Sequence, residues 1–280
     1  KNTGLKNYSG RIYIETQITK FLKVGTQTYA TFQTREPGNT SFTYMYQNTP
    51  AVTPYHDGKY GVSVDGASTS NLLADVMSRG GSYDDTRLNT TWYAKVNILD
   101  GLTAEARFNY QTLFNETATY SRKVDKQNFR TGEIIPGVSS STATTSRATT
   151  RYQNHTNTAT INYAKTFGKH DISILLGTEQ YYWNVKGFSA TRTGLLDLDL
   201  PDFTAALDLL DPTLGGTAEQ DYGVISYFGR LNYAYKNRYL LEANFRRDGS
   251  SRFGPDSRWG SFPSFSAAWR ITDEPFMEKM

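Results

Sequence analysis

The chain has 280 residues, a net charge of +3 and no cysteine, so disulfides and thiolate metal sites are excluded. The near-balance of charges gives no electrostatic preference for nucleic acid or for an acidic partner. No apolar run approaches the roughly 20 residues that a membrane-spanning helix needs. Twenty tyrosines and 15 phenylalanines in an otherwise polar sequence instead favour short strands with one apolar and one polar face.

Apolar and polar residues alternate along much of the chain, which is the pattern of half-exposed strands. From Leu102 the sequence reads LTAEARFNYQ, in which every second residue is apolar and the others are polar or charged. Several such runs approach the roughly ten residues of a tilted membrane strand. The pattern predicts about nine strands. They start near Arg11, Val24, Arg87, Leu102, Tyr152, Ile172, Tyr222, Tyr239 and Trp259.

Short and long connections between these strands alternate strictly along the chain. The short ones are predicted at 21–23, 99–101, 168–169 and 236–238, and the long ones at 36–86, 115–150, 187–221 and 248–258. A soluble sandwich has no reason to gather its long loops at one end. A transmembrane barrel has short turns on one side of the membrane and long loops on the other.

The parity of apolar residues predicts the register of three hairpins. At 99–101, a three-residue turn with Gly101 in the left-handed conformation sets Ile98 opposite Leu102. A three-residue turn at 236–238 and a two-residue turn at 168–169 pair Tyr235 with Tyr239, Tyr233 with Leu241, Leu231 with Ala243, Tyr163 with Ile174, and Ile161 with Leu176.

The two faces of the predicted strands suit different surroundings. Arg or Lys on a lipid-facing position costs roughly 2–4 kcal/mol at the bilayer midplane, and the cleanest apolar faces carry no charge. The opposite faces carry charges that suit a water-filled lumen. The residues expected to face that lumen are Lys95, Glu105, Arg107, Arg230 and Glu242. Arg230 and Glu242 are predicted to be diagonal neighbours, with Asn232 opposite Glu242.

Aromatic residues collect towards the ends of the predicted strands, as in the girdles at the two interfaces of a membrane barrel. The residues expected in these girdles are Tyr110, Phe114, Tyr181, Tyr182, Trp183, Tyr222, Tyr227, Tyr235, Tyr239 and Trp259. The pattern therefore predicts an all-β fold: a segment of an antiparallel, up-and-down transmembrane β-barrel.

Residues 227–277, YFGRLNYAYKNRYLLEANFRRDGSSRFGPDSRWGSFPSFSAAWRITDEPFM, resemble a signature of the SusC/RagA-type TonB-dependent outer-membrane transporters of Bacteroidetes. The family motif joins an RxDGSSRFG loop to RWGxFPS and a WRI-x-[DN]-E element. Its residues here are Arg246, Asp248, Gly249, Ser250, Ser251, Arg252, Phe253, Gly254, Trp259, Gly260 and Pro263. Weaker resemblance upstream includes QTREPG and PYHDGKYG.

The resemblance implies a barrel of 22 strands with an N-terminal plug, in the outer membrane of a Gram-negative bacterium, within its lipid and lipopolysaccharide bilayer. Such a transporter imports oligosaccharides or peptides beneath a SusD-like surface lipoprotein, and the TonB complex supplies the energy. Residues 1–280 are then expected to form part of the barrel, without the plug domain and the remaining strands.

Two loop regions are candidate contacts with the substrate or the lipoprotein. In the first long loop these are Tyr44, Tyr46, Tyr55, His56 and Asp57, although packing within a folded loop explains them equally well. The loop from Asp248 to Gly254 has the glycine, serine and aspartate content of a structured turn. A rim loop that contacts the substrate is the alternative.

Catalytic, metal and cofactor sites find little support. The three histidines are widely separated and lie in no motif, and no phosphate-binding glycine loop leads into a helix. The acidic stretch LDLDLPDFTAALDLLDP has no glycine in its turn and suits a short amphipathic helix better than a calcium site. We therefore expect no enzyme activity, metal, cofactor or nucleic acid.

Two alternatives share part of this pattern. One is a TonB-dependent receptor for a siderophore or vitamin, which has the same barrel without the FGPDSRWGSFPS signature. The other is a soluble β-rich carbohydrate-binding or adhesin module, in which a protein core covers the apolar faces.

Overall fold

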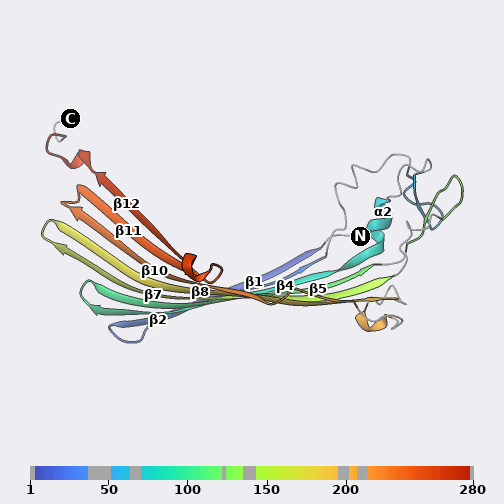
Figure 1. The fold of residues 1–280 in the computed structure, drawn as a ribbon, viewed down its shortest axis with the longest axis horizontal. Helices are drawn as coiled ribbons and strands as arrows, with labels where there is room; N and C mark the ends of the chain where they lie inside the picture. The colour runs from blue at the N-terminus through green and yellow to red at the C-terminus, as the bar shows by residue number, and fades with distance from the viewer. Residues whose placement is uncertain are drawn as a thin grey trace.

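The computed structural model describes residues 4–36, 52–63, 71–121, 124–134, 143–194, 202–206 and 213–277. Most of them belong to one antiparallel sheet, which forms a single curved layer in Figure 1. The strand order is β1-β2-β4-β5-β7-β8-β10-β11-β12, with β9 paired to β8. Each long strand therefore pairs with the long strands before and after it in the chain, as expected for an up-and-down barrel wall.

The elements have the following bounds. The long strands are β1 (Leu5–Gln17), β2 (Leu22–Arg35), β4 (Arg79–Leu99), β5 (Leu102–Ser121), β7 (Thr144–Phe167), β8 (His170–Thr193), β10 (Gln220–Tyr235), β11 (Tyr239–Ser250) and β12 (Trp259–Trp269). The short elements are β3 (Tyr60–Gly61), α2 (Leu72–Ser78), β6 (Lys126–Gln127), η1 (Phe203–Ala205), β9 (Thr213–Gly215), η2 (Pro255–Ser257) and η3 (Ile271–Asp273). Within the described ranges, no helix has the length and apolar character needed to cross a membrane.

The strands are longer than the alternation predicts. β7 and β8 have 24 residues each, and β4 and β5 have 21 and 20. Consequently the long connections run from 36 to 78, 122 to 143 and 194 to 219, and are shorter than predicted. The added lengths are rich in threonine and polar on both faces, so they show no alternation. β-branched threonine nevertheless favours extended backbone.

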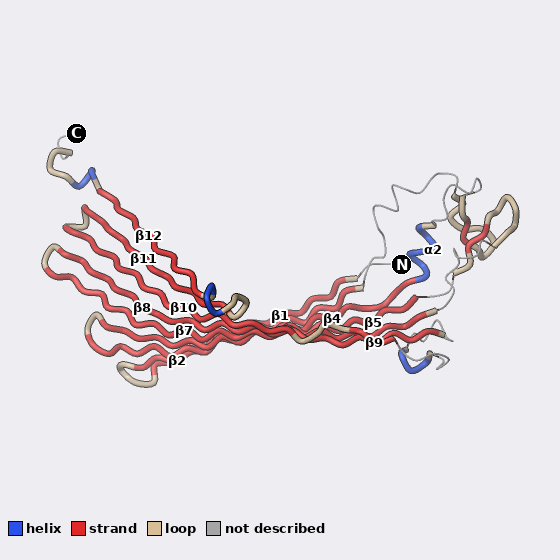
Figure 2. The backbone as a smooth tube through the Cα atoms, in the orientation of Figure 1, coloured by secondary structure: helices blue, strands red, loops and turns tan. Residues whose placement is uncertain are grey.

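The short turns lie at one end of the sheet, and the described parts of the long connections lie at the other (Figure 2). The predicted registers at 168–169 and 236–238 are confirmed, residue by residue. At 99–101 Gly101 is left-handed (φ 81°), and Trp92 lies opposite Phe108 in the predicted register. The register then shifts, so that Leu99 and not Ile98 pairs with Leu102.

The first short turn lies at 18–21, not at the predicted 21–23. The Thr19 side chain explains the difference, because its Oγ1 accepts hydrogen bonds from the backbone N–H groups of Phe21 (3.3 Å) and Leu22 (3.0 Å). A threonine that bonds neighbouring backbone amides is a common turn former. Leu22 can therefore begin β2.

One face of the sheet, here called the apolar face, carries Trp92, Phe108, Leu231, Phe265 and the residues paired with them. These side chains stay open: Trp92 is 47% exposed, Leu231 43% and Phe265 79%. No second layer of described residues packs on them, and the buried apolar residues are few and mostly small. A soluble β-sandwich would enclose such side chains in a core. The single-layer sheet instead has the form of a barrel wall.

Glycines on two strands leave room for aromatic rings of the neighbouring strands. Gly177 of β8 lies opposite Phe228 of β10, and a Cβ at Gly177 would come within 2.4 Å of the Phe228 ring. Gly25 meets Tyr93 in the same way across β2 and β4. Each ring therefore fills the space above a residue that lacks a side chain.

Candidate functional site

The opposite side of the sheet, here called the polar face, collects the charged residues that were expected to share a face. Directly paired residues lie on the same side of a sheet. Lys95 of β4 pairs with Glu105 of β5, and this row of paired residues continues across the next strands through Thr160, Gly177 and Phe228. By this parity Lys95, Glu105, Arg107, Arg230 and Glu242 all project from the polar face.

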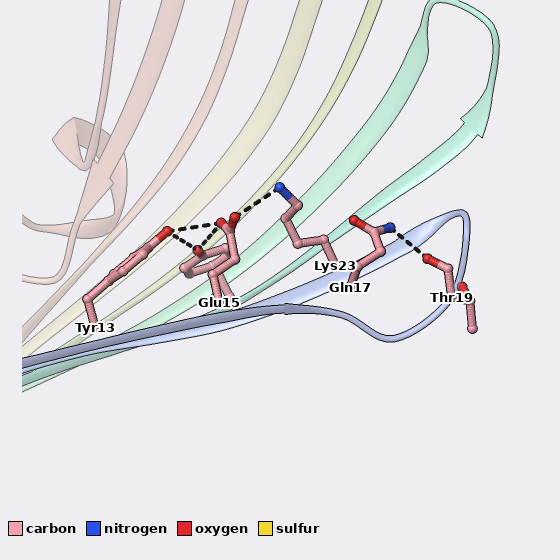
Figure 3. A network of polar contacts seen from close by, with 6 residues as sticks. Tyr13, Glu15, Gln17, Thr19 and Lys23 are labelled. Carbon is pink, nitrogen blue, oxygen red and sulfur yellow. Dashed lines mark hydrogen bonds and ion pairs between the residues drawn. The ribbon is translucent and has the colours of Figure 1, made fainter.

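A first network covers the polar face of β1, β2 and β4 (Figure 3). The Glu15 carboxylate accepts hydrogen bonds from the Tyr13 hydroxyl (3.0 Å), the Lys23 ammonium (2.9 Å) and the Tyr93 hydroxyl. The Arg107 guanidinium of β5 lies 5.4 Å from the centroid of the Tyr93 ring and pairs with Glu105. Charged and hydroxyl groups thus join four consecutive strands.

A second network centres on Arg246 of β11. Its Nη2 donates to Glu179 Oε1 (3.1 Å) and Ser226 Oγ (2.9 Å), and its Nε donates to Asp248 Oδ1 (2.8 Å). Glu179, Ser226 and Asp248 pair in a row across β8, β10 and β11, so one side chain connects three strands. The Arg246 side chain is 43% exposed, so each of these ion pairs contributes at most about 1 kcal/mol. The network therefore orients the charges more than it stabilises the fold.

Asn244 joins the predicted diagonal pair, Arg230 and Glu242. The Arg230 Nε donates to Asn244 Oδ1 (2.8 Å), and the Asn244 amide donates to Glu242 Oε1 (2.7 Å). Asn232 lies opposite Glu242, as predicted. The two charges are therefore connected through a neutral side chain.

An aromatic cluster lies on the polar face towards the long connections. Trp183 and Tyr181 of β8 flank Tyr222 of β10, with ring centroids 5.4 and 5.8 Å from that of Tyr222. The prediction that these three residues join the interfacial girdle is wrong, since the register places them on the same side as Glu179. Consecutive strand residues alternate in side, so only Tyr182 of the Tyr181–Tyr182–Trp183 run reaches the apolar face.

The signature loop folds back onto β10 beside this cluster. Ser251 exchanges two 2.9 Å hydrogen bonds with Gly223, one from its backbone N–H and one to its Oγ. The guanidinium of the next residue, Arg252, lies 4.0 Å from the centroid of the Tyr222 ring. The loop thus places a cation and an aromatic platform on the polar face.

The remaining signature residues shape the strands around that loop. Asp248, Gly249 and Ser250 belong to β11, so the predicted turn is confined to the residues after Ser250. Gly249 lies opposite Trp259, and a Cβ at Gly249 would come within 2.8 Å of the Trp259 ring. The rest are Phe253 and Gly254, which are exposed in the loop, and Gly260 and Pro263, which lie in the edge strand β12.

The described parts of two long connections, between β2 and β4 and between β5 and β7, meet in a small cap. β3 pairs in parallel with β6, and so joins the β2–β4 connection to the β5–β7 connection. Asn71 caps α2, and its amide also donates to the carbonyl oxygens of Pro54 and Gly61, both at 2.8 Å. The buried Asn71 side chain therefore fixes the start of α2 against the loop strands.

The candidate loop residues occupy the rim of this cap. Tyr55 is 52% exposed, and its ring centroid lies 5.0 Å from that of Tyr60. His56 contacts the Phe129 ring edge-on, and Asp57 lies in the tight turn that follows. Tyr44 and Tyr46 fall outside the described residues.

The chain is similar to known TonB-dependent receptors over almost its whole length. Over 99% of its length the chain is 25% identical to the TonB-dependent receptor P3 of Formosa agariphila, and it covers 28% of that protein. Over 42% of its length it is 36% identical to the TonB-dependent receptor SusC of Bacteroides thetaiotaomicron, and it covers 11% of that protein. No family model matches the chain.

The fold matches that of a solved transporter. A structure of the RagAB peptide transporter superposes on 98% of this chain with a TM-score of 0.75 at 22% identity, and the match covers 31% of that chain. Together with the similarity to SusC, this confirms the resemblance predicted from residues 227–277. The chain spans less than a third of the length of these proteins.

Proposed function

We propose that this SusC/RagA-type segment forms part of the wall of a TonB-dependent importer in the outer membrane of a Gram-negative bacterium. Its apolar face contacts lipid and its polar face lines the lumen. The importer takes up oligosaccharides or peptides with a SusD-like surface lipoprotein, and the TonB complex drives it. The similar proteins are receptors and a transporter, so we propose transport without catalysis.

The observation that carries this proposal is an uncovered apolar face of bilayer height. On that face, one aromatic row runs through Tyr235, Tyr239 and Trp269, and another begins at Trp259 opposite Gly249. Gly249 is ten positions after Tyr239 in β11, so the two rows are about 33 Å apart along the strand. At a tilt of about 40° this becomes about 25 Å, the height of the apolar band of a membrane barrel.

The short turns and the long connections, at opposite ends of the sheet, also indicate which end faces the periplasm. Barrels of this type have short periplasmic turns and long extracellular loops. In this proposal the cap near Asn71 is extracellular, and residues 272–277 begin a periplasmic connection. The cap residues Tyr55, His56 and Asp57 would then contact the substrate or the lipoprotein.

The aromatic cluster of Tyr181, Trp183 and Tyr222 is our candidate for a substrate contact in the lumen. Aromatic rings bind the apolar faces of sugars and of peptide side chains, while nearby hydroxyl and charged groups bind the polar edges. Arg252 covers one ring of the cluster and supplies a hydrogen-bond donor beside it.

Uptake by the complete receptor that carries this segment tests the proposal. Deleting its gene should stop growth on an oligosaccharide or peptide supplied as the sole nutrient, and the purified receptor should retain a surface lipoprotein. Trp183→Ala should weaken substrate binding about two- to tenfold, the value of one lost aromatic contact. The matched control is Tyr182→Ala, which truncates the adjacent ring on the apolar face.

Two results would contradict this proposal. Growth defects confined to iron or vitamin limitation would favour a siderophore or vitamin receptor. Equal loss of binding in the Trp183 and Tyr182 variants would show that truncation disturbs the strand rather than a substrate contact.

A further inference from the structure

A groove of about 550 Å³ crosses the apolar face of β10, β11 and β12 near the short turns. Its floor is Ala243 and Ala267, which alternate with larger neighbours along the strands. Those neighbours are Leu231, Tyr233, Leu241 and Phe265. The volume falls in the range of small-molecule sites, and the lining on this face is apolar apart from the hydroxyl of Tyr233.

An aromatic row closes the groove on the side of the turns. The rings of Tyr235, Tyr239 and Trp269 follow one another at 6.3 Å between centroids, and His170 lies 5.0 Å from Tyr235. Tyr233 continues this row into the groove, since its hydroxyl lies 2.7 Å from His170 Nδ1. Such rows of amphipathic rings are typical of the level of lipid headgroups.

Beside this aromatic row lies Lys236, a cation without a partner carboxylate among the described residues. The Lys236 Nζ lies 5.5 Å from the centroid of the Tyr235 ring, and no carboxylate in the described parts of the chain lies within ion-pair distance of it. Arg238, two residues further on, is instead engaged by Glu274 at 3.0 Å. Lys236 is therefore available to bind an anion.

We propose that this groove binds a glycerophospholipid from the leaflet beside the short turns. One acyl chain lies on Ala267 and Ala243, and the lipid phosphate contacts Lys236. Tyr239 and Ala243 are about 13 Å apart along β11, which leaves room for a stretch of acyl chain below the headgroup. The inference rests on the proposed function, since it requires the apolar face to contact a bilayer.

A second groove offers a matched control. It has about 520 Å³ and lies between Trp92, Phe108 and Ala159, with Ala106 on its floor. Arg107 also lines this groove, but its side chain projects from the polar face, where it pairs with Glu105. Among the described residues, this groove therefore combines alanines in its lining with no free cation beside them.

The test measures phospholipid bound to the complete receptor. The receptor is delipidated in mild detergent and titrated with phosphatidylglycerol or phosphatidylethanolamine, and bound copies are counted by native mass spectrometry. The variants are Ala243→Leu, which fills the groove, Lys236→Asn, which removes the charge, and Lys236→Arg, which keeps it. Lys236 is left-handed (φ 52°), a conformation that asparagine adopts readily. The control is Ala106→Leu, and added leucine on a lipid-facing surface does not oppose folding.

We expect the titration to load one phospholipid onto each unmodified receptor and none onto Ala243→Leu. Lys236→Asn should weaken binding about fivefold, as expected for one lysine near an anionic headgroup. Lys236→Arg and Ala106→Leu should bind normally. Equal binding in all variants, a bound lipopolysaccharide, or cross-links to a second copy of the chain across the groove would overturn the proposal.

Localisation and uptake are measured on the same variants to separate the two proposals. A receptor that reaches the outer membrane and imports its substrate, but binds no phospholipid, overturns the lipid site alone. A receptor found elsewhere overturns the proposed function, and the lipid site with it.

Discussion

Glu274 shows how one residue can fasten the end of the sheet. It lies just after β12, is 7% exposed, and accepts hydrogen bonds from Tyr239 (2.7 Å), Trp269 (3.0 Å) and Arg238 (3.0 Å). The hydrogen bond from Tyr239 lowers the pKa of Glu274 below its ordinary value, with further contributions from Trp269 and Arg238. One carboxylate thus ties β11, β12 and the turn between β10 and β11.

The pH dependence of stability follows from the direction of this pKa shift. Because the pKa of Glu274 is lower in the folded state, its contribution is complete above the unfolded pKa. It is lost as the pH falls through the folded value. Glu274→Gln should therefore lower the unfolding temperature at pH 7 and flatten its decline in acid, as measured by thermal unfolding of the receptor in detergent. Asp273→Asn, an exposed neighbour in η3, is the control, and an equal effect there would contradict the assignment.

The residue-level contacts were only partly predictable from the sequence. Parity along β11 places Arg246 and Asp248 on the polar face. It does not give the stagger between strands that brings Glu179 of β8 to Arg246. The Tyr181–Trp183 run was misassigned for a related reason, since aromatic composition indicates a girdle whichever way each ring points. A strict count of alternate positions would have separated Tyr182 from its two neighbours.

At the scale of the strands, Gly177 of β8 leaves room for the Phe228 ring of β10. Gly177→Ala would place a methyl group within 2.4 Å of the Phe228 ring. The expected cost is about 1–3 kcal/mol, measured by urea unfolding of the receptor in lipid vesicles. Adding Phe228→Ala should recover much of that loss. Gly10→Ala of β1, where a Cβ meets nothing within 4 Å, should cost little. Equal losses at both glycines would exclude a steric cause.

The registers of the elements were predictable and their ends were not. Turn residues such as Gly101, together with apolar parity, leave a single register that aligns both faces of a hairpin. The ends of β7 and β8 next to the long connections carry residues that are polar on both faces, such as the run TTSRATT in β7. The alternation of apolar and polar residues marks only the part of a strand whose two faces have different surroundings. It does not detect a strand that continues beyond that part with polar residues on both faces.

At the scale of the whole molecule, single-cysteine labelling tests which face of the sheet contacts lipid. The chain has no cysteine, so single cysteines can be introduced into it without background from this segment. In intact cells, Phe265→Cys on the apolar face should resist a water-soluble maleimide and react with a lipid-soluble one. Ser266→Cys, the next residue of β12, should show the reverse once the outer membrane is made permeable. The opposite pattern would place water on the apolar face.

The parallel pairing of β3 with β6 has a practical consequence for receptor engineering. Tyr60 and Gly61 lie in the connection between β2 and β4, and Lys126 and Gln127 lie in the connection between β5 and β7. Each connection therefore supplies only one strand of this small sheet. A chimera that exchanges only one of these connections would leave the retained strand without its backbone partner. Grafts intended to transfer specificity between receptors should therefore move both connections together.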